Sequence, residues 1–258
     1  MTDTTLGQPK AALGLGSLIG ESFSIFFRHF IQIIIVAFVP IVLGRTFSGL
    51  LIGFDVAIGV KGMQIFKAGA VSALVSSYVV KLVAGYLATA LLVQLAYDAK
   101  LHRPVRLARY FGPTLSALLP LVAIGIVASI AELIGIALLI VPGLWLSAVF
   151  FVIAPAIVIE RVGFRGLARS AALTKHYRWP IVGLFILTLV FVLSLGFAMV
   201  FLTKLIVASG GIALGFVLSA VLSSIGAGLA SLLVVLTYAR LREIKEGVSV
   251  DQIASVFD

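Results

Sequence analysis

Arg45, Lys81 and Glu132 are ionisable side chains that interrupt long apolar stretches of the sequence, which makes them the first candidates for chemistry. A charge at the centre of a membrane helix costs about 2.5–3.5 kcal/mol, so such a residue serves a polar pathway or binding site, or a partner neutralises it. Arg45 and Glu132 lie at comparable depths, so an ion pair between them would remove much of both costs. The stem of Lys81 can reach toward the membrane surface. A structural ion pair and a functional site between helices both remain open.

Catalytic and metal-binding patterns are missing from the sequence. The histidines, His29, His102 and His176, lie in basic segments without a carboxylate cluster, where neighbouring cations disfavour a metal ion. The chain contains no cysteine, which excludes disulfides, Cys metal sites and Cys nucleophiles. The Gly210-Gly211 pair lacks the lysine and hydroxyl residue of a phosphate-binding loop. We therefore expect no enzyme activity, no cofactor and no metal.

The basic residues gather in every second gap between the apolar stretches. Fourteen of the 19 lysines and arginines lie in these gaps: Lys10, Arg28, Lys100, Arg103, Arg106, Arg109, Arg161, Arg165, Arg169, Lys175, Arg178, Arg240, Arg242 and Lys245. The alternate gaps hold Lys61, Lys67 and Lys204. This alternation is the positive-inside signature of a polytopic membrane protein, and it predicts that both termini lie in the cytoplasm. The net charge of +9 is then expected to face anionic lipid headgroups rather than nucleic acid.

The composition indicates that lipid surrounds most of the chain. Hydrophobic residues make up 62% of it and charged residues 11%, whereas a water-soluble domain carries roughly 25% charged residues. A crossing needs about 20 apolar residues. The stretches that qualify are 31–52, 71–97, 115–138, 141–159, 181–203 and 212–238. Val141-Pro142-Gly143 is the expected turn between the third and fourth. The predicted fold is all-α: a single polytopic membrane domain, 1–258, with six transmembrane helices.

Amphipathic helices are predicted on the cytoplasmic face. The first spans 17–30, where polar residues recur at helical spacing opposite a row of aromatic residues. The second begins at Pro104 and is expected to stop at Gly112-Pro113, with a simple connecting loop as the alternative, and the third spans about 163–179. The tail, 239–258, is predicted to be soluble and to contain a short helix near its end. The expected interfacial anchors are Phe23, Phe26, Phe27 and Trp179.

Small residues recur at every fourth position of the last apolar stretch. They are Gly211, Gly215, Ser219, Ser223, Ala227 and Ser231. Such a seam lets two helix backbones approach closely, which drives helix association in lipid. The partner is either another helix of the same chain, or a second copy or another membrane protein. The first alternative predicts internal packing and the second a homo-oligomer or a heteromeric complex.

Several phrases resemble a bacterial family of six-helix membrane proteins. They are Val141-Pro142-Gly143-Leu144-Trp145, Pro155-Ala156, Glu160, Ala168-Arg169-Ser170, Leu173-Thr174-Lys175, Trp179, the segment from Leu241 to Gly247, and the terminal Val256-Phe257-Asp258. The chain resembles the YciC-like proteins and the membrane domain attached to some glycerophosphodiester phosphodiesterases. The resemblance implies a multi-pass protein of the bacterial inner membrane. The catalytic barrel of the phosphodiesterases has no counterpart in this sequence, so their activity is not carried over.

The sequence thus favours a non-enzymatic module that binds anionic phospholipid headgroups, or a protein partner, through a basic cytoplasmic surface. The residues expected to bind are Arg103, Arg106, Arg109, Arg165, Arg169 and Lys175. The alternative is a transporter or channel for a small solute or a lipid, with its polar site around Arg45, Lys81 and Glu132.

Overall fold

The computed structural model describes residues 13–62 and 69–247, and within these ranges it contains helices and no strand. The helices are α1 Leu15–Arg28, α2 Phe30–Ile52, α3 Phe54–Ala57, α4 Ala70–Lys100, α5 Phe111–Leu138, α6 Ile140–Phe150, α7 Ile153–Ile159, α8 Gly166–Thr174, α9 Arg178–Ala208 and α10 Ile212–Glu246, with 3₁₀ turns η1 Leu107–Arg109 and η2 Gly163–Arg165. The short helix predicted near the end of the tail lies outside these ranges.

Six helical segments are long and apolar enough to cross a membrane: α2, α4, α5, α6 together with α7, α9 and α10. The expectation of an all-α polytopic membrane protein is confirmed. Lipid must be the solvent for most of this surface, because large apolar side chains such as Phe197, Leu138 and Leu119 are more than 70% exposed. A backbone in hydrocarbon has to satisfy its own hydrogen bonds, and a helix does this within one segment.

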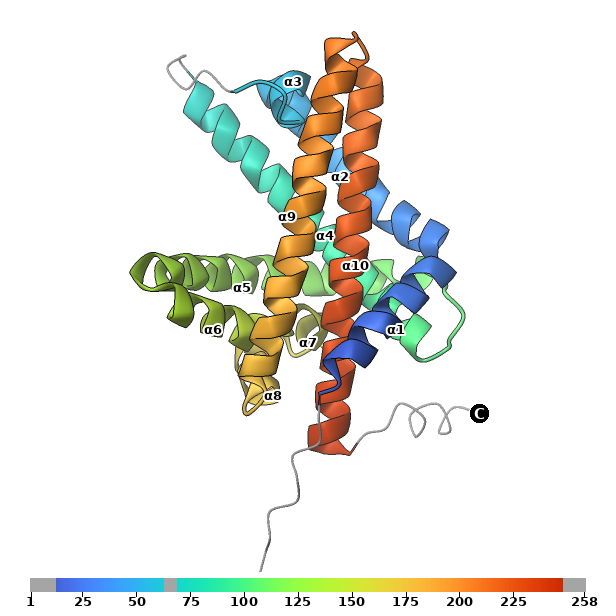
Figure 1. Cartoon of the computed structure of the whole chain (residues 1–258), viewed down its shortest axis with the longest axis vertical. Coiled ribbons are helices and arrows are strands. Elements are labelled where there is room, and N and C mark those ends of the chain that lie inside the picture. Colours follow the sequence, from blue (N-terminus) through green and yellow to red (C-terminus); the bar gives the residue numbers. More distant parts are fainter. Residues whose placement is uncertain (1–12, 63–68, 248–258) are drawn as a thin grey trace, which may run out of the picture.

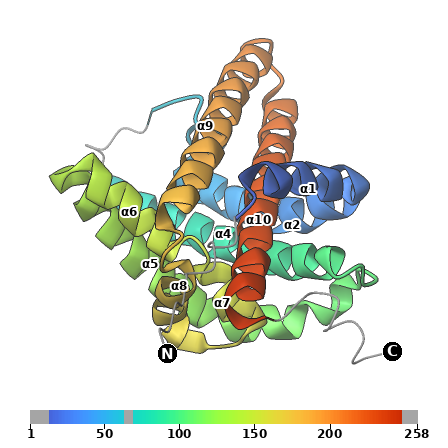
Figure 2. The ribbon, with the colours of Figure 1, turned by 60° about the horizontal axis from the view of Figure 1, so that its bottom comes forward.

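The crossings form three hairpins that diverge from the region around α7, α8 and the end of α10, which we call the base (Figure 1). They are α2–α4, α5–α6 and α9–α10. The α5–α6 hairpin extends to the left in both views, whereas the α9–α10 hairpin extends upward, and Figure 2 shows this arrangement with the bottom of the molecule turned forward. Helix α10 lies at the centre of the base and contacts α1, α2, α4, α7, α8 and α9. Helix α9 is the most exposed crossing, because only 6% of its most apolar 18-residue stretch is buried inside the molecule.

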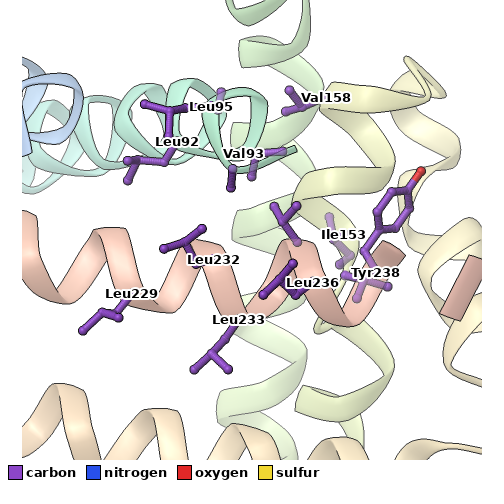
Figure 3. Close-up of a cluster of buried hydrophobic side chains, with 14 of the residues drawn as sticks. Leu92, Val93, Leu95, Ile153, Val158, Leu229, Leu232, Leu233, Leu236 and Tyr238 are labelled. Carbon is purple, nitrogen blue, oxygen red and sulfur yellow. The ribbon is translucent and has the colours of Figure 1, made fainter. Parts of the chain in front are cut away.

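The core lies where α4, α7 and α10 meet (Figure 3). Leu92 and Val93 of α4 point toward Leu232 and Leu236 of α10, and all four are nearly inaccessible. Ile153 of α7 closes the cluster from the side. This packing fixes α7 beside the end of α4, which positions the candidate site described below.

The turn between α5 and α6 lies at Leu139, three residues before the predicted Pro142. Leu139 is extended, with φ −157° and ψ 136°. Pro142 belongs to the first turn of α6, where its missing N–H would have no intrahelical partner in any case. Gly143 instead allows close packing, because a Cβ there would lie 2.3 Å from Cγ1 of Ile136.

The fourth crossing is broken rather than continuous. Helix α6 ends at Phe150 and α7 begins at Ile153. Pro155 explains the break, since a proline ring clashes with the carbonyl four residues before it, here that of Phe151. The two pieces together still make a membrane span of 20 residues.

The predicted surface helices are formed in two of the three segments. Helix α1 covers 15–28 and α8 covers 166–174. The second segment, after Pro104, is a connection with one 3₁₀ turn, and α5 already begins at Phe111 because Pro113 fits in its first turn. The simple-loop alternative is therefore correct there.

The aromatic residues of α1 divide between two roles. Phe23 and Phe27 are 40% and 70% exposed, as anchors should be. Phe26 is only 3% exposed, so the expectation that it is an anchor is wrong. Its ring packs over Gly228 of α10, because the missing side chain leaves room there.

Candidate functional site

Three arginines from two distant segments line one pocket at the base of the molecule. Arg103 and Arg109 belong to the connection between α4 and α5, and Arg161 follows α7. The pocket has a volume of about 390 Å³. Its other walls are Gln94, Tyr97, Asp98, Pro104, Tyr110, Pro113, Val158 and Ile159. We call it the arginine pocket.

The floor of the arginine pocket is held by hydrogen bonds. The Tyr110 hydroxyl donates to Oδ2 of Asp98 over 2.8 Å. Nε2 of Gln94 donates to Oγ1 of Thr114 over 2.6 Å and to the carbonyl of Tyr110 over 3.2 Å. Burial, and then the bond to Asp98, raises the pKa of Tyr110, so its hydroxyl stays protonated and keeps donating. The floor is therefore ordered before any ligand binds.

The arginine pocket is electropositive. Asp98 is the only carboxylate among its lining residues, and it already accepts from Tyr110. Arg109 and Arg161 are exposed and form no ion pair within the described residues. A guanidinium presents five donors in a planar fork that matches phosphate or carboxylate. Such a pocket suits an anion.

Arg161 holds an unusual backbone conformation. Its φ is +54°, the left-handed region, directly after Glu160 caps α7. Glycine normally takes this place after a helix, because a side chain there costs about 1–2 kcal/mol. A residue that adopts it reverses the chain sharply, and here the reversal returns Arg161 to the wall of the arginine pocket. Strain of this kind concentrates at functional sites.

Arg169, expected to bind headgroups, is instead part of an internal network. Its Nε and Nη2 donate to Glu160 over 2.6 and 2.9 Å, and Nη2 also pairs with Glu246. The Tyr238 hydroxyl donates to Oε1 of Glu160 over 2.7 Å. The hydrogen bond to Glu160 raises the pKa of Arg169 further above its ordinary value. These contacts tie α8 to α7 and α10, so we assign Arg169 a structural role.

The other predicted basic residues remain on the surface. Arg106, Arg165 and Lys175 are exposed and form no ion pair in the described part of the chain. They do not line the arginine pocket. Their charges add to the field of the base without building a defined site.

The charges inside the apolar helices are arranged differently from the expectation. Arg45 of α2 donates to Ser219 and, over 2.6 Å, to Ser223 of α10. No ion pair joins Arg45 and Glu132 within 13–62 and 69–247. Lys81 lies close enough to Arg45 for their charges to repel. Glu132 lines a separate cavity between α4, α5, α7 and α10.

The seam of small residues serves contacts within the chain. Gly215 packs on α9, where a Cβ would lie 2.8 Å from Val207. Ser219 and Ser223 accept from Arg45, and Ala227 and Ser231 line the cavity of Glu132. Gly211 caps α10 at its start. Contacts within the chain thus involve Gly215, Ser219 and Ser223, and a partner outside the chain stays a prediction.

Sequence reasoning found Arg103 and Arg109 but missed Arg161 and the tyrosines Tyr97 and Tyr110 as members of the same pocket. No local sequence pattern predicts the pocket, because Arg161 comes more than fifty residues after Arg109. The packing of α7 on α4 brings these two arginines together. The isolated Asp98 at the end of an apolar stretch was the available signal. Comparison with family models, curated proteins and solved structures finds no match to this chain.

Proposed function

We propose that the protein is a non-enzymatic membrane module that binds anionic phospholipid headgroups at the cytoplasmic leaflet of a bacterial inner membrane. The observation that carries the proposal is the arginine pocket, which is lined by three arginines and by one carboxylate that already accepts a hydrogen bond. The positive-inside bias supports a cytoplasmic location for this end of the molecule. The resemblance to YciC-like proteins agrees with that membrane.

The chemistry of the walls favours a lipid phosphate over a free anion. Arg109 and Arg161 offer donors for the phosphate oxygens, and Pro104, Pro113 and Val158 supply an apolar wall for the glycerol and the first methylenes. The remaining basic residues strengthen the attraction to an anionic leaflet by about 1 kcal/mol each. Specific binding thus belongs to the pocket and general attraction to the surrounding surface.

Native mass spectrometry of the detergent-solubilised protein tests the proposal, because a micelle lacks the charged surface that attracts any cation. The Arg109→Gln/Arg161→Gln variant should lose phosphatidylglycerol affinity by at least about tenfold, since a hydrogen bond to a charged group contributes about 1.5–3 kcal/mol. The matched control is Arg165→Gln/Lys175→Gln, which removes the same charge outside the pocket and should bind as the wild type does.

Two results would overturn the proposal. One is an equal loss of phosphatidylglycerol in both double variants, which would mean that net charge alone attracts the lipid. The other is unchanged binding in the pocket variant. Thermal unfolding of each variant separates loss of binding from loss of fold.

A transporter for a small solute or a lipid is the second candidate, favoured by the cavity around Glu132 inside the apolar helices. Arg45 is engaged by serines of α10, so Lys81 and Glu132 would carry the polar site. Flux of a solute into liposomes that disappears in Glu132→Ala would favour this function over the first.

A further inference from the structure

Two adjoining cavities lie among the apolar helices, and each is lined by one charged side chain, the half-buried Glu132 in the first and the exposed Lys81 in the second. The carboxylate cavity, of about 320 Å³, is walled by α4, α5, α7 and α10 and contains Glu132. The lysine cavity, of about 470 Å³, lies on the neighbouring side of α4 and contains Lys81. Both are lined by Tyr86, Thr89 and Ser129, so the two spaces meet along one polar wall.

The shared wall is flanked by the two charges. Ser129 lies one helical turn before Glu132 on α5, and Tyr86 lies about one and a half turns after Lys81 on α4. Gly125 lets the Tyr86 ring pack against α5, because a Cβ there would lie 1.9 Å from its hydroxyl oxygen. A compact ligand resting on this wall has an anion on one side and a cation on the other.

Neither charge has a partner of opposite sign among the residues that the structure describes. Arg45 is engaged by Ser219 and Ser223 and is near Lys81, which makes the lysine cavity more positive. Glu132 is hydrogen-bonded to Ser147 of α6, a neutral partner that leaves its charge uncompensated. An uncompensated charge within a membrane is costly and marks a functional site by default. A ligand that brings an ammonium to Glu132 and a phosphate to Lys81 would compensate both.

An apolar groove continues from this polar space. It has a volume of about 430 Å³ and lies between α9 and α10, with Leu195, Gly196 and Met199 on one wall. It shares Ala227 and Ala230 of α10 with the carboxylate cavity. The whole space is therefore amphipathic, with a polar chamber at one end and a hydrocarbon-lined groove at the other.

We propose that this connected space binds one zwitterionic phospholipid of the phosphatidylethanolamine type. Its ammonium lies at Glu132, its phosphate at Lys81, and one acyl chain lies in the groove between α9 and α10. A free zwitterion such as glycerophosphoethanolamine carries the same two charges but leaves the groove empty, so the groove favours the lipid. The assignment does not depend on the arginine pocket, and it names the ligand of the Glu132 cavity whether or not transport follows.

Native mass spectrometry of the full chain, delipidated in detergent, tests the charges. Glu132→Gln and Lys81→Gln should each weaken phosphatidylethanolamine binding by about tenfold, since each removes one charge-assisted contact. The matched control is Lys204→Gln, an exposed lysine on α9 that lines none of these cavities, and it should bind as the wild type does. Unchanged binding in both cavity variants would overturn the proposal.

A second variant tests the groove. Gly196 lines the groove and a Cβ there meets no atom within 4 Å, so Gly196→Leu starts its side chain in open space and takes up volume in the groove. It should weaken binding of phosphatidylethanolamine while glycerophosphoethanolamine binds as before. Equal competition by glycerophosphoethanolamine in the wild type would mean that the site takes a free zwitterion, and the lipid assignment would be wrong. The arginine pocket is tested separately, by the loss of phosphatidylglycerol binding in the Arg109→Gln/Arg161→Gln variant. A failure of the present proposal is therefore distinct from a failure of the arginine pocket.

Discussion

Glu160 is a residue on which three elements of the base converge. Its carboxylate accepts two bonds from Arg169 of α8 and one from Tyr238 of α10, while Glu160 itself ends α7. The side chain is 15% exposed, so little water is available to replace these partners. A carboxylate buried with this many donors is expected to contribute more than a surface ion pair does.

Replacing Glu160 with Gln should lower the free energy of unfolding by about 1–3 kcal/mol, because the guanidinium of Arg169 loses its bidentate partner. The control is Glu243→Gln, whose pair with Arg240 is one helical turn away and whose side chain is 42% exposed. That change should cost no more than about 0.5 kcal/mol. Thermal unfolding in a fixed detergent measures both, and equal shifts in the two variants would show that the network adds nothing.

Residue-level contacts are the part of this molecule that the sequence predicts least. Comparable depth makes Glu132 a possible partner of Arg45, but Arg45 hydrogen-bonds to serines 174 and 178 residues away. Depth along a helix says nothing about rotation around it, and the rotation decides which neighbour a side chain meets. Serines every fourth residue indicated a packing seam, and nothing in that spacing distinguishes a close helix contact from a set of acceptors for a guanidinium.

Elements were predictable to the degree that hydropathy determines them. Five of the six crossings lie within about five residues of their predicted bounds, because burial of apolar surface in lipid needs about 20 residues whatever the sequence detail. The exception is α10, which continues to Glu246, so residues 239–246 of the predicted tail belong to this helix. The errors lie at prolines. Pro142 and Pro113 were expected to stop helices, yet both lie in first turns, where a proline is tolerated. Pro155 does interrupt its crossing, and composition alone does not separate these cases.

The close approach of α10 to α1 and α2 depends on one missing side chain. A Cβ on Gly228 would lie 2.5 Å from Cγ2 of Ile33 and 3.2 Å from Cε2 of Phe26. Both neighbours are buried and are unable to move aside without displacing the core. Gly228 therefore sets how deeply the first two helices pack against the central one.

Gly228→Ala should lower the free energy of unfolding by about 1–3 kcal/mol, as overpacking of a dense core does. The matched control is Gly183→Ala on α9, where a Cβ meets no atom within 4 Å. There the change should be neutral or stabilising by up to about 1 kcal/mol, because alanine favours the helix. If Gly228→Ala were as stable as Gly183→Ala, the close contact between α10 and α1 would not exist in solution.

The whole molecule consists of three hairpins of apolar helices that diverge from the base (Figure 1). The arginine pocket lies at the base, and the cavities of Glu132 and Lys81 lie higher, between the hairpins. The diverging hairpins leave apolar surfaces such as that of α9 open to lipid. Lipid therefore belongs to the architecture, and the direction in which the molecule crosses the bilayer decides which leaflet the arginine pocket meets.

That direction can be measured because the chain has no cysteine, so each introduced thiol is unique. Ala108 and Ala168 are exposed in basic segments, and Ser209 is exposed at the tip between α9 and α10. In intact bacterial cells a membrane-impermeant maleimide should label Ser209→Cys, and should label Ala108→Cys and Ala168→Cys only after lysis. A permeant maleimide should label all three without lysis, which controls for reactivity. Labelling of Ala168→Cys from outside would place the arginine pocket at the opposite leaflet, where no positive-inside bias could account for its charge. Labelling of Ala168→Cys and Ser209→Cys from the same side would contradict the number of crossings between these two residues.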